Sequence, residues 1–139
     1  MSDHVHDDYL LSALTGQIIG AAKTVHGELG PGFEEVVYQR ALALEFPVHG
    51  LDFSREVWID VHYRGKRVGK KRVDFIVGDA TGDVMVEIKA KNAVEDVDFV
   101  QTLSYLKASG HVVALLLNFG ARRLGIRRIV YETARRQKR

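Results

Sequence analysis

The feature that most constrains the fold is a pair of strand-like segments joined by a short turn in the middle of the chain. Residues 72–77 (RVDFIV) and 84–89 (VMVEIK) are separated by residues 78–83 (GDATGD). Successive side chains in a strand point to opposite faces. The pattern therefore predicts an antiparallel hairpin. Its apolar face is formed by Val73, Phe75 and Val77 of the first segment and by Val84, Val86 and Ile88 of the second.

Polar residues occupy the other face of this hairpin. Asp74 lies there in the first segment, and Glu87 and Lys89 lie there in the second. A symmetric turn places Asp74 roughly opposite Glu87, and like charges directly opposite each other repel. A cation between them would remove that repulsion, and hard oxygen ligands of this kind suit Mg²⁺. The alternative is an ordinary solvated sheet face, whose ion pair contributes only about 0–1 kcal/mol.

Hydrophobic periodicity and turn residues place the other elements. We expect helices over about 8–29, 33–47 and 96–109, and strands over about 57–64, from the turn near Gly65 to about 77, and over 83–90, 112–119 and 124–131. The third helix presents Val100, Leu103 and Leu106 as its inner stripe. The run 112–119 is apolar throughout, which is typical of a strand buried on both faces, and the helix before it predicts parallel pairing through a right-handed crossover. The fold class is thus α/β, a mixed central sheet flanked by helices in the order α-α-β-β-β-α-β-(β).

Length and composition set further limits. The 139 residues fit one domain over 1–139, in which we expect residues 1–7 and the basic tail 132–139 to be mobile. No apolar run reaches the ~20 residues that span a bilayer, and the acidic N-terminus is unlike a signal peptide. Cysteine is absent, which excludes disulfides and thiolate metal sites. We therefore expect a cytoplasmic location and no membrane partner.

Basic residues gather in two stretches although the net charge is only +2. These residues are Arg64, Lys66, Arg67, Lys70, Lys71 and Arg72 in the first stretch, and Arg122, Arg123, Arg127, Arg128, Arg135, Arg136, Lys138 and Arg139 in the second. Such clusters have two interpretations. They bind phosphate backbones, or they are only a solvated surface in the first stretch and a frayed basic tail in the second. On the first interpretation, the candidates for nucleic-acid contact are Lys70, Lys71, Arg72, Arg122 and Arg123.

Three helical positions have two interpretations each. Gln101 and Tyr105 lie one helical turn apart, so they share a face; Gln101 either reaches a metal-bound water or a phosphate oxygen, or is a surface side chain beside a core-edge Tyr105. Glu35 lies in the first turn of the expected second helix and is either stabilised by the helix dipole, at ~0.3–1 kcal/mol, or a further metal ligand. His26 either interacts with the last carbonyls of its own helix or approaches the site.

His4 and His6 near the N-terminus indicate adventitious metal binding at most.

Together these stretches resemble a known family. Residues 30–38 (GPGFEEVVY) place Gly32, Glu35 and Tyr38 on the named positions of the GxxExxY proteins, which belong to the RecB-like and lambda-exonuclease-like branch of the PD-(D/E)XK nuclease superfamily. Residues 72–74 (RVD), 87–89 (EIK) and 101–105 (QTLSY) resemble the aspartate strand, the E-x-K strand and the QxxxY helix. Residues 117–120 (LNFG) and 127–130 (RRIV) resemble the family's C-terminal end, and the similarity covers about residues 11–130. Val73 replaces the proline of the PD motif.

The resemblance implies a restriction-endonuclease-like core and the hydrolysis of phosphodiester bonds, with DNA as the expected substrate. It implies that Asp74, Glu87 and the Ile88 carbonyl hold Mg²⁺ or Mn²⁺, and that Glu35 completes the site directly or through water. Lys89 would position the attacking water, and Gln101, with Tyr105 of the same motif, would steady it or the phosphate.

Two other functions remain open, and so does the oligomeric state. The chain could be a non-catalytic module that keeps the fold and binds nucleic acid or a partner protein. It could also contain an acidic metal site that only holds the fold. A domain of this size often acts as a homo-oligomer or in a larger complex.

Overall fold

The computed structural model describes the backbone of residues 3–132 and the side chains of residues 11–132. Its elements are α1 (Asp3–Leu29), α2 (Glu35–Glu45), the short 3₁₀ helix η1 (Phe46–His49), β1 (Asp52–Tyr63), β2 (Lys66–Asp79), β3 (Gly82–Lys89), α3 (Asp96–Ser109), β4 (Val113–Asn118) and β5 (Gly125–Val130). The predicted α/β class and the predicted order of elements are confirmed. The main differences lie at the ends: α1 begins before residue 8, and β1 begins before residue 57. Residues 1–2 and 133–139, in which part of the expected mobile termini falls, lie outside the described residues, and so do the side chains of His4 and His6.

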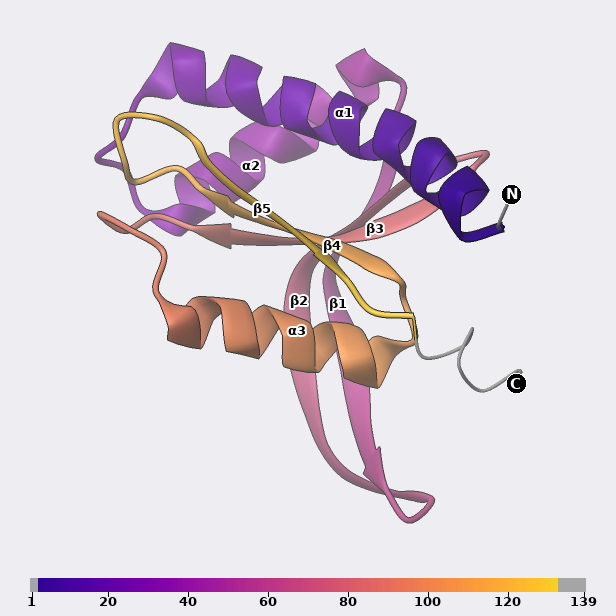
Figure 1. Cartoon of the computed structure of the whole chain (residues 1–139). Helices are drawn as coiled ribbons and strands as arrows, with labels where there is room; N and C mark the ends of the chain where they lie inside the picture. The colour runs from indigo at the N-terminus through magenta and orange to yellow at the C-terminus, as the bar shows by residue number, and fades with distance from the viewer. Residues whose placement is uncertain (1–2, 133–139) are drawn as a thin grey trace.

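One mixed five-stranded sheet forms the middle layer, in the order β1-β2-β3-β4-β5. The pairs β1–β2, β2–β3 and β4–β5 are antiparallel, and β3–β4 is parallel. Helices α1 and α2 cover one face of this sheet and α3 covers the other (Figure 1). The parallel pairing of the strands on either side of α3 is as predicted from the strand–helix–strand connection.

Two hydrophobic cores lie on the two faces of the sheet. Phe75, Val86 and Leu115 pack under α1 and α2, whereas Met85 and Leu116 pack under α3. Side chains of β4 enter both cores, and all six residues of this strand are buried. The continuous apolar run is therefore explained by burial on two faces.

The predicted apolar face of β2 is wrong at Val73. Phe75 and Val77 pack under α1 and α2, but Val73 packs in the α3 core with Met85. The ladder between β1 and β2 is interrupted between Val57↔Val73 and Arg55↔Phe75, where Glu56 adopts a left-handed φ of 56°. A non-glycine residue in this region distorts the strand locally. The strict alternation that the prediction assumed does not hold across the interruption.

The predicted inner stripe of α3 is wrong at Val100, which is 57% exposed. The buried positions of this helix are Asp98, Thr102 and Leu106, spaced four residues apart. The helix is rotated so that Asp98, a charged residue, faces the sheet. Two lysines compensate the buried charge, as described below.

Strands β1 and β2 continue well past the edge of β3 and form a two-stranded arm that projects from the body of the molecule (Figure 1). Residues 66–74 of β2 lie beyond the pairing with β3, which ends at Phe75↔Val86. We call residues 56–72 the hairpin arm. Within the described residues, no helix is long and apolar enough to cross a membrane.

Candidate active site

The candidate site begins where β2 and β3 separate. Their last paired residues are Phe75 and Val86; beyond them β2 stays with β1, while Glu87 and Ile88 of β3 pair with β4. Side chains close the gap between the two strands. The Asp74 N–H donates to Glu87 Oε1 at 2.8 Å, and the Ile88 N–H donates to Asp74 Oδ2 at 2.7 Å. The predicted meeting of Asp74 and Glu87 therefore occurs at a fork in the sheet.

Burial and mutual repulsion dominate the electrostatics of this carboxylate pair. Burial first, and then the charge of Asp74, raises the pKa of Glu87 to about 8. Burial also raises the pKa of Asp74, while the hydrogen bond from Ile88 opposes the shift. Two adjacent buried carboxylates do not both ionise easily unless a cation compensates them. The oxygen donors and the unfavourable negative charge fit a hard divalent cation.

Glu35 lies at the start of α2, exposed, and its charge further raises the pKa of both Asp74 and Glu87. It is thus close enough to act on the pair electrostatically. Among the residues whose side chains the structure describes, however, no three His, Cys, Asp or Glu side chains lie together in a group that could hold a metal ion. The ligand role of Glu35 stays a prediction.

Two residues on the α2 side of the gap were missed by the sequence reasoning. Gln39 Nε2 donates to Asp74 Oδ1 at 2.9 Å, and Arg55 Nη2 donates to Gln39 Oε1 at 3.5 Å. The buried Nε of Arg55 has no hydrogen-bond partner. Gln39 follows Glu35 by four residues, so the two share one face of α2. That spacing was the available signal for Gln39, but only the packing of α2 shows that this face meets Asp74.

Tyr38 fixes the loop that leads into α2. Its hydroxyl donates to the Gly30 carbonyl at 2.6 Å and accepts from the Phe33 N–H at 3.2 Å. Its ring is buried and stacks on Phe119, with the centroids 4.8 Å apart. Gly30 and Gly32 both have positive φ, at 68° and 113°. Tyr38 thereby holds a tight glycine turn in place and, with it, the end of α2 that carries Glu35.

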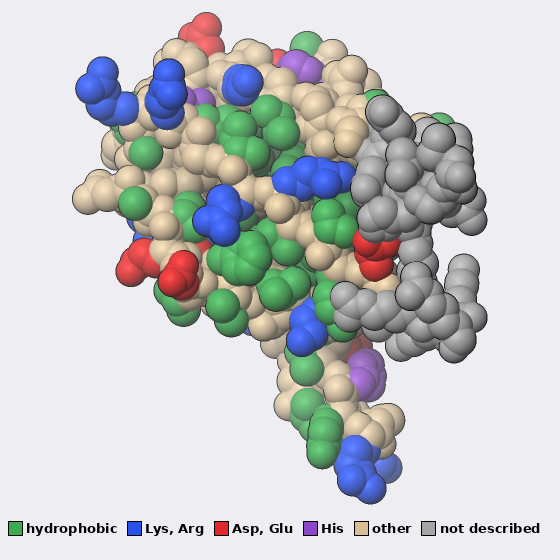
Figure 2. All heavy atoms as spheres, viewed as in Figure 1, with side chains coloured by type: hydrophobic (Ala, Val, Ile, Leu, Met, Phe, Trp, Pro, Cys, Tyr) green, Lys and Arg blue, Asp and Glu red, His purple; other side chains and the backbone are tan. Residues whose placement is uncertain are grey.

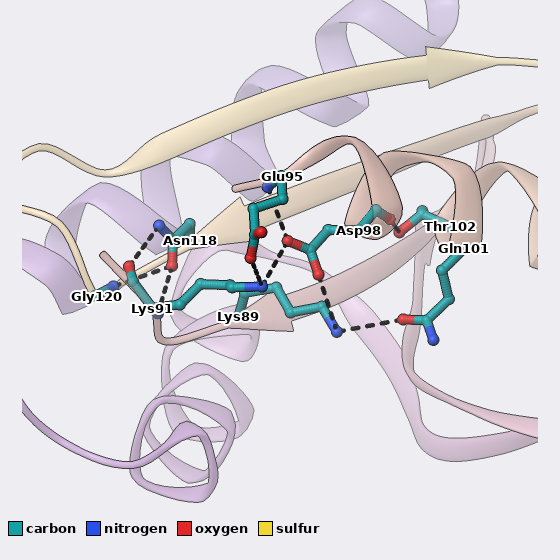
Figure 3. A network of polar contacts seen from close by, with 8 residues as sticks. All are labelled: Lys89, Lys91, Glu95, Asp98, Gln101, Thr102, Asn118 and Gly120. Carbon is teal, nitrogen blue, oxygen red and sulfur yellow. Dashed lines mark hydrogen bonds and ion pairs between the residues drawn. The ribbon is translucent and has the colours of Figure 1, made fainter. Parts of the chain in front are cut away.

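The α3 side of the gap fixes Lys89, the last residue of β3. Its Nζ donates to Gln101 Oε1 at 3.3 Å and lies 3.9 Å from Asp98 Oδ1 (Figure 3). Lys89 also lowers the pKa values of Asp74 and Glu87 through its charge. The predicted face of α3 thus does reach the site, although Gln101 contacts Lys89 and not the carboxylates.

Asp98, the second partner of Lys89, is a buried residue that the sequence reasoning missed. Its Oδ2 accepts hydrogen bonds from Lys91 Nζ and from the Glu95 N–H, both at 2.9 Å. These bonds lower the pKa of Asp98, so it keeps its negative charge. A buried carboxylate stabilised in this way holds the Lys89 ammonium at a fixed place beside the gap.

Asn118, the last residue of β4, joins the segment after β3 to the segment after β4 (Figure 3). Its side chain accepts from the N–H groups of Lys91 and Gly120 and donates to the Lys91 carbonyl. The packing here is tight: a Cβ on Gly120 would lie 2.3 Å from the Lys91 nitrogen. The chain that follows Lys89 is therefore rigidly supported.

Tyr105 lies next to Gln101 on α3 and is half-buried. Burial raises its pKa, the nearby Lys71 opposes this, and the charge of Glu87 adds to it. The Lys71 ammonium lies 5.9 Å from the centre of the Tyr105 ring. Tyr105 is thus at the edge of the site, beside the hairpin arm.

The remaining predicted residues lie further out. Lys70 and Arg72 are exposed on the hairpin arm, whereas Arg122 and Arg123 are exposed in the loop between β4 and β5. His26 forms neither of the predicted contacts: its Nε2 lies 2.9 Å from the Ala121 carbonyl oxygen in that same loop. The end of α1 is thereby joined to the β4–β5 loop.

Comparison with known proteins agrees with this geometry. A family model described as the PD-(D/E)XK nuclease superfamily matches residues 12–129. No curated protein and no solved structure matched the chain. The chain therefore belongs to the PD-(D/E)XK nuclease superfamily, and its α/β architecture, with two helices before the mixed sheet and one helix between β3 and β4, is consistent with the core of that superfamily.

Proposed function

We propose that this chain is a metal-dependent nuclease that hydrolyses phosphodiester bonds in DNA, and within its superfamily a protein of the GxxExxY type. It would act in the cytoplasm in repair, recombination or defence. The observation that carries the proposal is the fork between β2 and β3, where the carboxylates of Asp74 and Glu87 meet with Lys89 beside them. Membership of a nuclease superfamily supports it.

Mg²⁺ or Mn²⁺ would be held by Asp74, Glu87 and the Ile88 carbonyl, with Glu35 as a further ligand directly or through water. The raised pKa values of Asp74 and Glu87 support this choice of ligands, because burial and mutual repulsion outweigh the opposing charge of Lys89. A divalent cation bound there lowers the pKa of its water and stabilises negative charge on phosphate oxygens.

The ammonium of Lys89 would position the attacking water and stabilise developing negative charge. Asp98 and Gln101 support this role because they fix the Lys89 Nζ from the α3 side. Gln101 and Tyr105 would steady the water or the scissile phosphate. Lys70, Lys71, Arg72, Arg122 and Arg123 would contact the phosphate backbone.

One observation favours a second candidate, a non-catalytic module that binds nucleic acid. Asp74 and Glu87 already accept hydrogen bonds from main-chain N–H groups, and no third acidic or histidine side chain joins them among the described side chains. Such a module would bind nucleic acid equally well with and without metal. A nuclease requires the metal for turnover.

Cleavage of linear, circular and branched DNA, with RNA as a further substrate, separates the two candidates. We expect cleavage with Mg²⁺ or Mn²⁺ and none in chelator, and at least a hundredfold loss in Asp74→Asn and in Lys89→Ala. Lys107→Ala, which removes an exposed ammonium from α3, is the matched control and should cleave normally. Full activity in either site variant, with both folded by circular dichroism, would refute the proposed site.

A further inference from the structure

The hairpin arm lies outside the carboxylate site, although its lysines and arginines are among the residues proposed to contact phosphates. It projects beyond the sheet, and basic side chains cover its tip in the space-filling view (Figures 1 and 2). Between Glu56 and Arg72 the sequence has six lysines and arginines and two acidic residues. This stretch is therefore much more basic than the chain as a whole, and its charge suits a polyanion.

The two faces of the arm differ. On the inner face, Ile59 is buried in the α3 core and its partner Lys71 lies near the Tyr105 ring of α3. On the outer face, Trp58 lies opposite Arg72, and Asp60 lies opposite Lys70. The outer face therefore points away from α3, and Trp58 remains 55% exposed on it.

Two cations lie close to the indole ring of Trp58. The Lys70 Nζ is 4.5 Å from the ring centroid, and the Arg72 Cζ is 5.6 Å from it. An exposed aromatic ring beside lysine and arginine is the combination that binds single-stranded nucleic acid: a base stacks on the ring, and the cations take the phosphates. Cation–π contacts at exposed sites are weaker than the stacking of a base, so a base can displace Lys70 from the ring.

This outer face leads directly to the candidate site. Arg72 and Asp74 are two residues apart in β2, which is about 6–7 Å along a strand. Arg72 lies on the outer face opposite Trp58, and Asp74 contacts Gln39 of α2, which also lies on the side of the sheet away from α3. A strand bound along the arm would therefore bring its next phosphates to the fork between β2 and β3.

We propose that the outer face of the hairpin arm binds a single-stranded stretch of nucleic acid adjacent to the bond that is cleaved. One unpaired base stacks on Trp58, and Lys70 and Arg72 bind the phosphates on either side of it. A duplex keeps its bases stacked on each other and offers none to the ring. The placement next to the scissile bond rests on the proposed nuclease function, whereas the binding itself does not.

Trp58 is the single tryptophan of the chain, so tryptophan emission reports on this face alone. The full chain is titrated in chelator, where no cleavage occurs, with an oligothymidylate strand and with a duplex of equal length. We expect a saturable change in Trp58 emission with the single strand and at least tenfold weaker binding of the duplex. No change in emission, or equal affinity for the duplex, overturns the proposal.

Variants test the roles of the Trp58 ring and the Lys70 charge. Their binding to a labelled oligothymidylate is measured by fluorescence anisotropy. Trp58→Leu should weaken binding about tenfold, and Trp58→Phe, which keeps a stacking ring, should lose less affinity. Lys70→Gln should weaken binding and reduce the slope of log affinity against log salt by about one. The matched control is Lys107→Gln, which removes an ammonium that also lies over an aromatic ring, 5.7 Å from the centre of Tyr131. Equal loss in Lys70→Gln and Lys107→Gln overturns the proposal.

The same experiments separate this proposal from that of the nuclease. If the protein binds the single strand as expected but does not cleave DNA in Mg²⁺ or Mn²⁺, the binding role of the arm is supported and the nuclease function is refuted. If the protein cleaves DNA and Trp58→Leu binds the oligothymidylate with unchanged affinity, the nuclease function is supported and the binding role of the arm is refuted. The arm could instead be the contact to a second copy of the chain. In that case Trp58→Leu would change the molar mass measured by light scattering but leave the affinity for the oligothymidylate unaltered. This result would overturn the proposal.

Discussion

At the scale of single residues, Asp74 and Glu87 are each held by a main-chain N–H of the other strand. These bonds replace ladder contacts that the separation of the strands removes. They also force two carboxylates into one buried place, where their charges repel. The protonation of Glu87 is therefore coupled to the stability of the protein.

Glu87→Gln should change how stability depends on pH in metal-free protein. The pKa of Glu87 is raised from 4.5 to about 8, so its contribution to stability is fully present below about pH 4.5 and is lost as the pH rises toward 8. The amide that replaces the carboxyl group is neutral at every pH and keeps an oxygen that accepts from the Asp74 N–H. We expect the variant to exceed the wild type at pH 8 by on the order of a few kcal/mol, with the difference falling to about 1 kcal/mol near pH 5.

Urea unfolding in chelator at pH 5 and pH 8 measures this difference. Glu28→Gln, on the exposed face of α1, is the control and should show no such dependence on pH. A constant difference between wild type and Glu87→Gln at both pH values would contradict the strained carboxylate pair.

The sequence predicted this pair but not its supporting residues, for a physical reason. Asp74 and Glu87 follow from alternation and from the register of a short hairpin, which are local properties. Gln39 and Asp98 depend on how α2 and α3 are rotated against the sheet, which is set by packing far along the chain. Asp98 was not among the predicted site residues, because a carboxylate is expected to be buried only where it has partners such as Lys89 and Lys91.

At the scale of elements, the turn between α1 and α2 depends on one aromatic residue. Gly30 and Gly32 have the positive φ values that let the chain reverse, and the Tyr38 hydroxyl connects Gly30 to Phe33. Sequence patterns predicted the stop after Leu29 and the start of a second helix near residue 33. They did not predict that the tyrosine of the GxxExxY run is a structural residue with a buried hydroxyl.

Tyr38→Phe should destabilise the protein although the ring and its stacking on Phe119 are retained. The change leaves the Gly30 carbonyl and the Phe33 N–H without their partner, which costs about 1–3 kcal/mol. Thermal and urea unfolding measure the loss, and DNA cleavage should also fall because the start of α2 carries Glu35. Tyr63→Phe, at a position that is 66% exposed, is the stability control. Equal stability of Tyr38→Phe and wild type would show that the hydroxyl does not hold the turn.

The third helix shows the limit of periodicity as a guide to orientation. Its bounds, Asp96–Ser109, agree with the prediction, but the buried stripe is Asp98, Thr102 and Leu106 and not the stripe that contains Val100. Thr102 and Asp98 are polar, so a search for apolar residues at helical spacing selects the neighbouring stripe. The same rotation of α3 places Gln101 against Lys89. It therefore explains both the wrong prediction for Val100 and the contact between Gln101 and Lys89.

At the scale of the whole molecule, the candidate site lies where all three layers meet. The α2 layer supplies Gln39, the sheet supplies Asp74 and Glu87, and the α3 layer supplies the partners of Lys89. The order of strands and the parallel pairing of β3 with β4 were predictable from the elements and their connections. The separation of β2 from β3 was not, because it results from the course of the long hairpin arm and from the distortion at Glu56.

Binding of a divalent cation should therefore stabilise the whole fold through this one place. At a free metal concentration of about 100 times Kd, the stabilisation is about 2.7 kcal/mol, which corresponds to a rise in Tm of several degrees for a domain of this size. The rise should be larger at pH 8 than at pH 6, since the metal binds the deprotonated carboxylates and Glu87 has a pKa of about 8. Differential scanning calorimetry with Mg²⁺, with Mn²⁺ and with chelator measures it.

Asp74→Asn should abolish the rise in Tm, whereas Asp83→Asn, which removes an exposed carboxylate from the same hairpin, should keep it. A metal that only held the fold would give a different combination: a large loss of stability in chelator and no cleavage in the presence of the ion. An equal rise in Tm for Asp74→Asn and wild type would mean that the cation binds elsewhere, and the carboxylate pair at the fork would then need another explanation for its strain.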